Sequence, residues 1–228
     1  MDWFEPVRAY CERTGGEFWA EPVNALSNAA FLIAAAAGAR RAARTAPPDR
    51  AGLALSGLVA IVGIGSFLFH TLAVFWSMLA DVIPIALFIY AYLALALLRY
   101  LRVPPIAVVG MTAAFALIGL SLTPVLNSLT GRDVAVMSNG SIDYLPALLA
   151  LFGIAAATIG RPEERITGTG RRLAGIGVLF LVSLNTRTLD RSACTFLPIG
   201  THALWHLLNA AVLYALVATA IRHRQTVG

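Results

Sequence analysis

Long apolar runs, separated by short polar stretches, make up most of this chain. The runs cover residues 24–39, 52–98, 103–124, 141–160, 173–186 and 196–221. A membrane-spanning helix needs roughly 20 apolar residues. The run 52–98 would be on the order of 70 Å long as one helix, against a hydrocarbon core of about 30 Å, so we expect two helices joined by a tight turn. The pattern therefore predicts seven membrane-spanning helices.

These runs predict helices and not barrel strands, because barrel strands alternate polar and apolar side chains at every second residue. We expect an all-α membrane protein with a single domain over residues 1–228, of which residues 222–228 form a cytoplasmic tail. The sixth helix is expected to be short and to end at Asn185. Residues 1–21 are expected to lie at the outer interface, anchored by the aromatic side chains of Trp3, Phe4, Tyr10, Phe18 and Trp19.

Composition and charge support this topology. The chain is 58% hydrophobic and 13% charged, which excludes a soluble domain with a polar surface. All 17 basic residues are arginines, and with the N-terminus outside, twelve fall on the inner side and five on the outer side, as the positive-inside rule requires. The positive charge is therefore a topology signal and does not indicate nucleic-acid binding. The five outer arginines are Arg8, Arg13, Arg132, Arg187 and Arg191.

The source and location follow from the same composition. The chain is rich in alanine and arginine and contains no lysine, which points to a GC-rich bacterial genome. We therefore expect a multi-pass protein of the bacterial inner membrane, with its outer end toward the periplasm and its C-terminus in the cytoplasm.

Few ionisable side chains lie within the predicted helices, and they share one depth. His70 ends the second helix, Asp81 begins the third, and His202 and His206 begin the seventh. Such residues are costly in lipid unless they are paired or line a wet cavity, so they are functional candidates. Ser66 lies four residues before His70 and therefore on the same helix face, although its small size could also simply ease helix contact.

The spacing of His202 and His206 lets two imidazoles bind one ion, and His70 from another helix would complete a three-histidine site. Three histidines leave the fourth tetrahedral position for water, which is the arrangement of a catalytic zinc. The histidine pair could instead form helix-packing hydrogen bonds, and Asp81 could be an outer-shell partner, a proton relay or part of an ion path. Convergence of these residues at one level favours the metal. His223 is expected to be solvated in the tail.

The two cysteines, Cys11 and Cys194, fall on the outer side in this topology. A disulfide between them would be possible in an oxidising compartment and would tie the N-terminal segment to the last outer loop. The alternative is two free, half-buried thiols.

Three stretches together resemble one known family. SFLFH at 66–70, with Asp81 eleven residues after His70, and HALWH at 202–206 resemble the alkaline ceramidases, seven-helix zinc amidases related to the adiponectin-receptor-like proteins. The stretch from YCER to EPVNALSNAAF resembles their N-terminal region, so the likeness covers nearly the whole chain. The resemblance implies zinc bound by His70, His202 and His206, with Ser66 and Asp81 beside the metal water and a disulfide between Cys11 and Cys194.

The resemblance also bears on calcium. Some eukaryotic relatives hold calcium through acidic N-terminal residues, to which Glu12 and Glu21 match. This sequence departs from that pattern, because Ala9 stands where an aspartate ligand is expected and the segment is shorter. Both departures argue against calcium, and Glu21 with Asn24 could instead cap the first helix.

The residues and the resemblance predict a zinc-dependent intramembrane hydrolase that cleaves the amide bond of ceramide or a related N-acyl lipid to a fatty acid and a sphingoid base or other amine. We expect Asp81 to act as the base and Ser66 to donate a hydrogen bond to the oxyanion. Asn209, on the same helix face as His202, is expected to orient an imidazole.

Two alternatives belong to other functional classes. One is a receptor-like protein with a structural or signalling zinc site, and the other is a metal or proton transporter. A transporter should carry polar groups through to the inner face, whereas the inner halves of these helices are almost wholly apolar.

Overall fold

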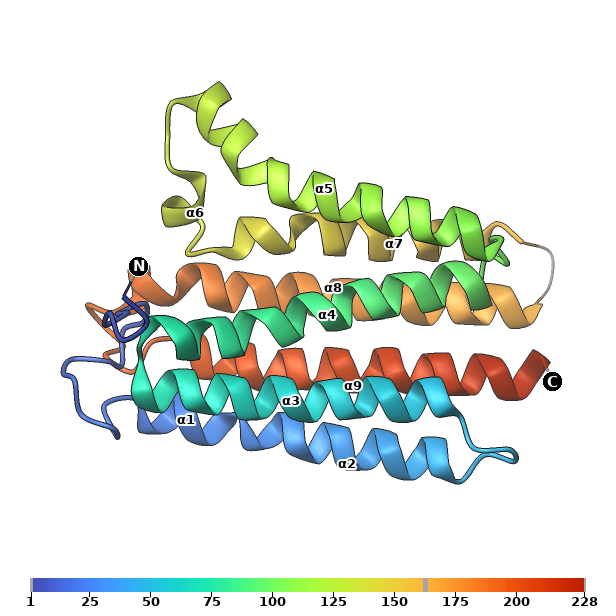
Figure 1. The fold of residues 1–228 in the computed structure, drawn as a ribbon, viewed down its shortest axis with the longest axis horizontal. Coiled ribbons are helices and arrows are strands. Elements are labelled where there is room, and N and C mark those ends of the chain that lie inside the picture. Colours follow the sequence, from blue (N-terminus) through green and yellow to red (C-terminus); the bar gives the residue numbers. More distant parts are fainter. Residues whose placement is uncertain (1, 162–163, 228) are drawn as a thin grey trace.

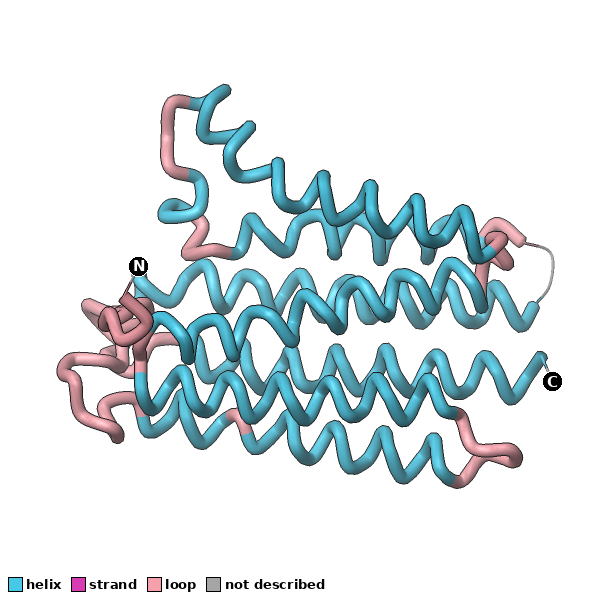
Figure 2. The backbone as a smooth tube through the Cα atoms, in the orientation of Figure 1, coloured by secondary structure: helices cyan, strands magenta, loops and turns pink. Residues whose placement is uncertain are grey.

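The structure is a computed structural model that describes residues 2–161 and 164–227, and it is built from helices (Figures 1 and 2). Within these ranges there is no strand, and a single isolated antiparallel bridge joins Pro6 to Val74. Seven helices in the described part of the chain are long and apolar enough to cross a membrane. The chain is therefore an all-α, multi-pass membrane protein, as predicted.

The seven spans run nearly parallel, and the two chain termini lie at opposite ends of the bundle (Figure 1). We call the end formed by residues 2–21 and 194–201 the outer end, and the end formed by residues 44–49 and 100–104 the inner end.

The first span combines α1 and α2. The elements are α1 (Pro22–Ser27), α2 (Ala29–Ala43), α3 (Arg50–Leu72), α4 (Phe75–Arg99), α5 (Pro105–Thr130), α6 (Val134–Met137), the 3₁₀ turn η1 (Ser141–Tyr144), α7 (Leu145–Ile159), α8 (Glu164–Ala193) and α9 (His202–Val227).

The division of the run 52–98 into two helices is confirmed. Only Ala73 and Val74 separate α3 from α4. Ala73 adopts the left-handed region with a φ of 48°, which is uncommon for a residue other than glycine. Its amide still donates to the Phe69 carbonyl at 2.9 Å. The sharp reversal keeps the last turn of α3 beside the first turns of α4.

The sixth span extends beyond its predicted end. α8 continues past Asn185 to Ala193. The prediction followed apolar runs, which report contact with lipid, whereas polar residues at the end of a span can remain helical by bonding to the preceding turn. Thr188 does so, because its hydroxyl donates to the Leu184 carbonyl at 2.9 Å.

The last helix is also shifted relative to its predicted run. α9 begins at His202 instead of near residue 196, and it continues to Val227. Residues 222–227 are therefore part of a helix and do not form a separate tail, while Gly228 lies outside the described residues.

A buried polar cluster ties the helices together at the inner end. Asp49 caps α3 through the Gly52 amide at 3.1 Å and accepts two hydrogen bonds from the Arg99 guanidinium at 2.7 and 2.8 Å. His223 is buried here, with its ring nitrogens 3.0 Å from the Thr169 hydroxyl and 3.1 Å from the Arg99 carbonyl. The expectation of a solvated His223 was wrong, because α9 continues past this residue and packs against α4 and α8.

α5 is the least buried of the spans. Only 6% of its most apolar window is buried, against 33–61% for the others. It diverges from α4 and α7 toward the outer end (Figure 1), and Pro124, which removes a backbone hydrogen bond and favours a bend, lies in that part of the helix. A cavity of about 450 Å³ lies between α4, α5 and α7.

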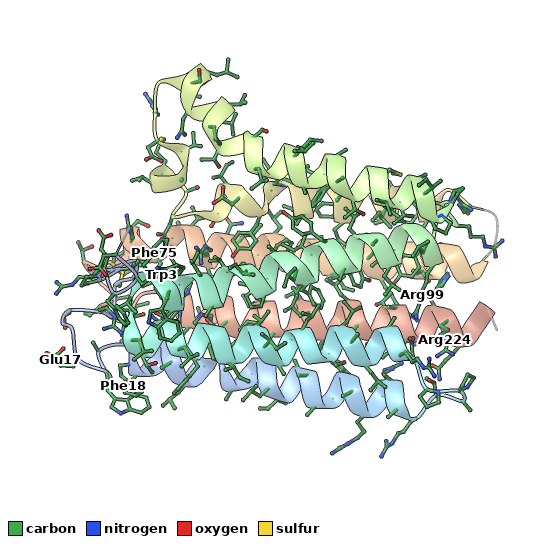
Figure 3. The ribbon with its side chains drawn as sticks, viewed as in Figure 1. Trp3, Glu17, Phe18, Phe75, Arg99 and Arg224 are labelled. Carbon is green, nitrogen blue, oxygen red and sulfur yellow. A yellow bond between two sulfur atoms is a disulfide. The ribbon has the colours of Figure 1, made fainter. Side chains whose placement is uncertain are left out.

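Residues 2–21 fold over the turn between α3 and α4. The Val7 amide donates to the Ala73 carbonyl at 2.8 Å. The rings of Trp3 and Phe75 pack with their centroids 6.0 Å apart, and Figure 3 shows them together at the outer end. The segment is therefore a fixed cover and not a loose arm.

A covalent bond joins this cover to the last outer loop. Cys11 and Cys194 form a disulfide with their Cα atoms 5.3 Å apart, which confirms the predicted bridge and rules out the alternative of two free thiols.

One interfacial anchor was predicted wrongly, since Tyr10 is buried against His202 and does not face the interface. The other four aromatic anchors are exposed, namely Trp3, Phe4, Phe18 and Trp19.

Candidate metal centre

Three histidine side chains converge at the outer end of the bundle. His70 comes from the last turn of α3, and His202 and His206 come from the first two turns of α9. All three are buried, and their ring centroids lie 4.5–5.1 Å apart. One nitrogen of each ring lies within 4.8 Å of the others. Three imidazole nitrogens are therefore within reach of a single metal ion.

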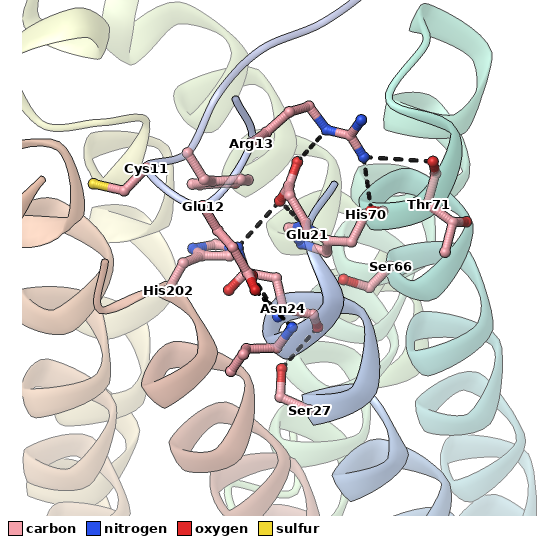
Figure 4. Close-up of polar contacts among 12 residues, drawn as sticks. Cys11, Glu12, Arg13, Glu21, Asn24, Ser27, Ser66, His70, Thr71 and His202 are labelled. Carbon is pink, nitrogen blue, oxygen red and sulfur yellow. Dashed lines mark hydrogen bonds and ion pairs between the residues drawn. The ribbon is translucent and has the colours of Figure 1, made fainter. Parts of the chain in front are cut away.

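Glu21 joins His70 to the N-terminal segment. Its Oε2 lies 2.6 Å from Nδ1 of His70, and its Oε1 accepts a hydrogen bond from Nε of Arg13 at 2.5 Å (Figure 4). Burial acts to raise the pKa of Glu21, but hydrogen bonds from His70, Arg13 and Asn24 outweigh it and hold the pKa below its ordinary value. An ionised carboxylate on Nδ1 orients the ring and leaves Nε2 available as a metal ligand.

The other two rings are also held by residues from the start of the chain. The Ser27 hydroxyl lies 2.7 Å from Nδ1 of His206. The ring of Tyr10 stacks on His202 with the centroids 3.5 Å apart. Residues within the first 27 positions therefore set the orientation of all three imidazoles.

Asp190, near the end of α8, fixes the start of α9. Its Oδ1 accepts the amides of Thr201 at 2.7 Å and His202 at 2.9 Å, and its Oδ2 accepts the Cys11 amide at 3.1 Å. A carboxylate at this position caps the positive end of the helix. Gly200 allows the close approach, since it has a φ of +65° and a Cβ there would overlap Asp190.

Ser66 and Asp81 meet where α3 and α4 approach most closely. A Cβ at Gly65 would overlap the Ala80 carbonyl, so only glycine permits this contact. The next residues along each helix, Ser66 and Asp81, are both buried, and the Ser66 hydroxyl lies close enough to interact with the Asp81 carboxylate. The Ser66 hydroxyl also lies 3.5 Å from Nε2 of His206. A carboxylate, a hydroxyl and an imidazole are thus adjacent.

Two ring nitrogens in this cluster lack a hydrogen-bond partner. Nε2 of His70 and Nδ1 of His202 are buried, and no group in the described part of the chain bonds to them. A buried polar atom left without a partner costs about 1–3 kcal/mol, so two in one cluster require an explanation. A metal ion would use such nitrogens. The residues therefore fit an ion held by three histidine ligands.

The residues matched to calcium ligands do not fit a calcium ion. The oxygens of Glu12 accept the amides of residues 23 and 24 at 2.7 and 2.8 Å, and both oxygens of Glu21 are engaged as described above. The Arg13 guanidinium is a fixed cation among the oxygens that a calcium ion would require as ligands. Besides Glu21, this guanidinium donates to the carbonyl oxygens of Gly15, Glu17, His70 and Thr71.

A narrow cavity of about 70 Å³ among α4, α7, α8 and α9 shares walls with the larger cavity beneath α5. Asn209 is buried in the wall of the narrow cavity. Among the described residues, no hydrogen bond joins Asn209 to an imidazole, and its expected role in orienting one stays a prediction. The shared lining residues are Ile85, Ile89, Phe115, Tyr144 and Ala147.

Four residues that position the histidines were not assigned this role from the sequence. Glu21 was matched to calcium or to a cap, Tyr10 was assigned to the interface, and Ser27 and Asp190 were not singled out. Asp190 lies within the preceding helix, twelve residues before His202, so no local capping signal in the sequence marks it. The contacts of Tyr10 and Glu21 with histidines far along the chain have no local signal.

The fold and the centre define a class: an all-α membrane protein with three buried histidines gathered at one depth, beside the buried side chains of Ser66 and Asp81. Residues 9–226 match the family model described as Ceramidase, so the chain belongs to the ceramidase family. Membership implies hydrolase activity on amides and a lipid substrate. No curated protein matches the sequence at a significant level.

Proposed function

We propose that this protein is a zinc-dependent intramembrane amidase that hydrolyses ceramide or a related N-acyl lipid to a free fatty acid and a sphingoid base or other amine. One observation carries the proposal. Three buried imidazoles, two of them with an unpartnered nitrogen, converge beside Asp81 and Ser66 in a member of the ceramidase family.

His70, His202 and His206 would hold the zinc ion. When bound, zinc supplies a Lewis acid and lowers the pKa of a coordinated water from about 15.7 to about 7. Glu21 supports the assignment, because a carboxylate on the second nitrogen of a ligating imidazole raises its basicity and fixes its orientation.

Asp81 is the proposed proton carrier. Its carboxylate would take a proton from the attacking water and deliver it to the departing amide nitrogen, which cannot leave as an anion. Ser66 would donate a hydrogen bond to the amide oxygen as negative charge develops there. Burial of both groups supports these roles, since hydrogen bonds act more strongly where water is excluded.

The depth of the centre supports a lipid substrate. The histidines lie within the first or last two turns of their spans, where the amide between an acyl chain and a polar base would rest in one leaflet. We place the protein in a bacterial inner membrane with this end toward the periplasm, on the basis of the arginine distribution and of a disulfide at the same end.

A metal analysis combined with a lipid screen tests the proposal. Purified full-length protein, prepared without chelator, is expected to contain about one zinc per chain and to release fatty acid from at least one N-acyl lipid. His206→Ala should abolish both properties, whereas His223→Ala at the inner end should retain them. Zinc retention without turnover of any N-acyl lipid would favour a receptor-like role, and retention of zinc in His206→Ala would refute the ligand assignment.

A further inference from the structure

Arg187 lies in the last two turns of α8, among the polar residues that extend past the predicted end of the sixth span, although it was expected in an outer loop. It lies on α8, inside the candidate span 168–193. Its Nη1 donates a hydrogen bond to the Tyr10 hydroxyl at 2.8 Å. This is the one hydrogen bond that the guanidinium makes to a described residue. Its Nε is buried without a partner, and no Asp or Glu in the described ranges forms an ion pair with it. The Asp81 carboxylate interacts with this charge electrostatically but does not contact it. A buried guanidinium nitrogen without a hydrogen-bond partner is costly and therefore makes Arg187 a functional candidate.

Three aromatic rings hold this guanidinium in place. Its central carbon lies 5.7 Å from the ring centroid of Tyr10 and 5.6 Å from those of Tyr144 and Trp205. Contact with ring faces attracts the cation but does not use its N–H groups. A guanidinium has five N–H donors arranged as a planar fork that matches a carboxylate or a phosphate. The rings therefore position a donor set that the protein itself leaves largely unused.

The guanidinium lines the cavity of about 450 Å³ between α4, α5 and α7. Gly140 leaves room for it there, since a Cβ at that position would lie 3.1 Å from Nη2 of Arg187. Asp143 lines the same cavity, but its carboxylate accepts a hydrogen bond from the Thr123 hydroxyl at 2.6 Å. Most of the remaining wall is apolar, including Ile85. The cavity thus pairs a cationic corner with apolar walls, as an acidic lipid requires.

Tyr10 links this cation to the histidines, because its ring lies 5.7 Å from the guanidinium carbon of Arg187 and stacks on His202 with the centroids 3.5 Å apart. A group bound by Arg187 would therefore lie only a few bonds from an amide held at the histidine cluster.

We propose that Arg187 binds an oxyanion, a carboxylate or a phosphate, on the amine portion of the substrate close to the amide. The preferred substrate class is then an N-acyl lipid with an acidic head group and not a neutral ceramide. The substrate preference rests on the proposed amidase function, whereas the binding of an oxyanion by Arg187 does not. Arg187 is a specificity residue here, since the neutral substrate does not need its charge.

The first test measures binding and does not require turnover. In a neutral detergent, dodecyl phosphate should raise the thermal unfolding temperature of the full-length protein, and 1-dodecanol at the same concentration should not. Arg187→Gln should remove this shift while zinc content is retained. Arg191→Gln, which changes an exposed arginine one turn further along α8, is the matched control and should keep it. An equal shift in wild type and Arg187→Gln would overturn the proposal, even if no lipid is hydrolysed.

The second test measures kcat/KM for two substrates with the same acyl chain, ceramide and ceramide 1-phosphate. The ratio should favour the phosphate in wild type and fall about 10- to 100-fold in Arg187→Gln, as expected for a lost charge-assisted hydrogen bond. The same experiment measures inhibition by palmitate, because the oxyanion that Arg187 binds could instead be the carboxylate of the fatty acid product. If Arg187→Gln weakens palmitate inhibition and leaves the ratio unchanged, the anion belongs to the product and the head-group assignment is wrong.

Discussion

Both ends of the bundle contain a buried histidine beside a buried carboxylate, but the two clusters differ in how completely they are satisfied. At the inner end, Asp49 accepts three hydrogen bonds, and both nitrogens of His223 have partners. At the outer end, His70 and His202 each keep a buried nitrogen without a partner in the described structure.

This difference distinguishes a cluster that stabilises the fold from a cluster that is available for binding or catalysis. A satisfied polar cluster rigidifies the helices that supply it, and its members already have their partners. An unsatisfied cluster is unfavourable by itself and requires a further partner, such as an ion, a ligand or an ordered water. Histidine content alone would not have distinguished the two ends.

The largest expected effect comes from the outer histidines. His202→Ala removes a proposed metal ligand, so zinc content and amide hydrolysis should both fall to background, as measured by elemental analysis and fatty acid release. His223→Ala should retain zinc and most activity, and should lower stability by about 1 kcal/mol through lost hydrogen bonds. Equal losses in both variants would break the distinction between the two ends.

Asp81→Asn should have the next largest effect. The amide cannot accept a proton as the carboxylate does, so kcat should fall about 10²- to 10⁴-fold while zinc remains bound. Asp133→Asn, at the cap of the exposed α6, serves as the matched control and should leave kcat unchanged. Full activity in Asp81→Asn would remove the proposed base.

Glu21→Gln should act by changing the orientation and basicity of His70 and not by removing a group that takes part in the reaction. Loss of the anionic partner on Nδ1 should weaken zinc affinity by about 10- to 100-fold, as measured by competition with a chelator of known affinity. At saturating zinc, much of the activity should return. If activity stays lost at full zinc occupancy, Glu21 has a more direct role than the orientation of a ligand.

Asp49→Asn should reduce stability by about 1–3 kcal/mol and leave activity per bound zinc unchanged. Burial acts to raise the pKa of Asp49, but hydrogen bonds from Arg99 and the Gly52 amide outweigh it and hold the pKa below its ordinary value. The stabilisation is therefore complete above the ordinary pKa of about 4 and is lost as the pH falls through the lowered folded pKa. The difference in unfolding temperature between wild type and variant should shrink on acidification below about pH 4. A difference that grows instead would contradict this assignment.

The smallest expected effect concerns calcium. Because the Arg13 guanidinium lies among the oxygens of the N-terminal segment, added calcium or a calcium-selective chelator should change neither unfolding temperature nor activity. A calcium-dependent rise in unfolding temperature would show that Arg13 can be displaced.

The sequence predicts the spans and the histidine cluster for one physical reason: lipid excludes polar groups, so apolar runs mark helices and the few exceptions are informative. It does not predict the bounds of α8 and α9, since polar turns at a span end remain helical without an apolar signal. It also cannot predict the contact between Glu21 and His70, 49 residues apart, which arises only when a cover segment folds onto helices already assembled.

The disulfide between Cys11 and Cys194 has a consequence for biogenesis. The sulfur of Cys194 follows α8, so the bond can form only after six of the seven spans have left the ribosome. Tyr10 is synthesised early but can reach its partner His202 only after the start of α9 has been made. Nascent chains that end before Cys194 should therefore carry neither the crosslink nor a complete histidine centre, because His202 and His206 follow Cys194 in the chain.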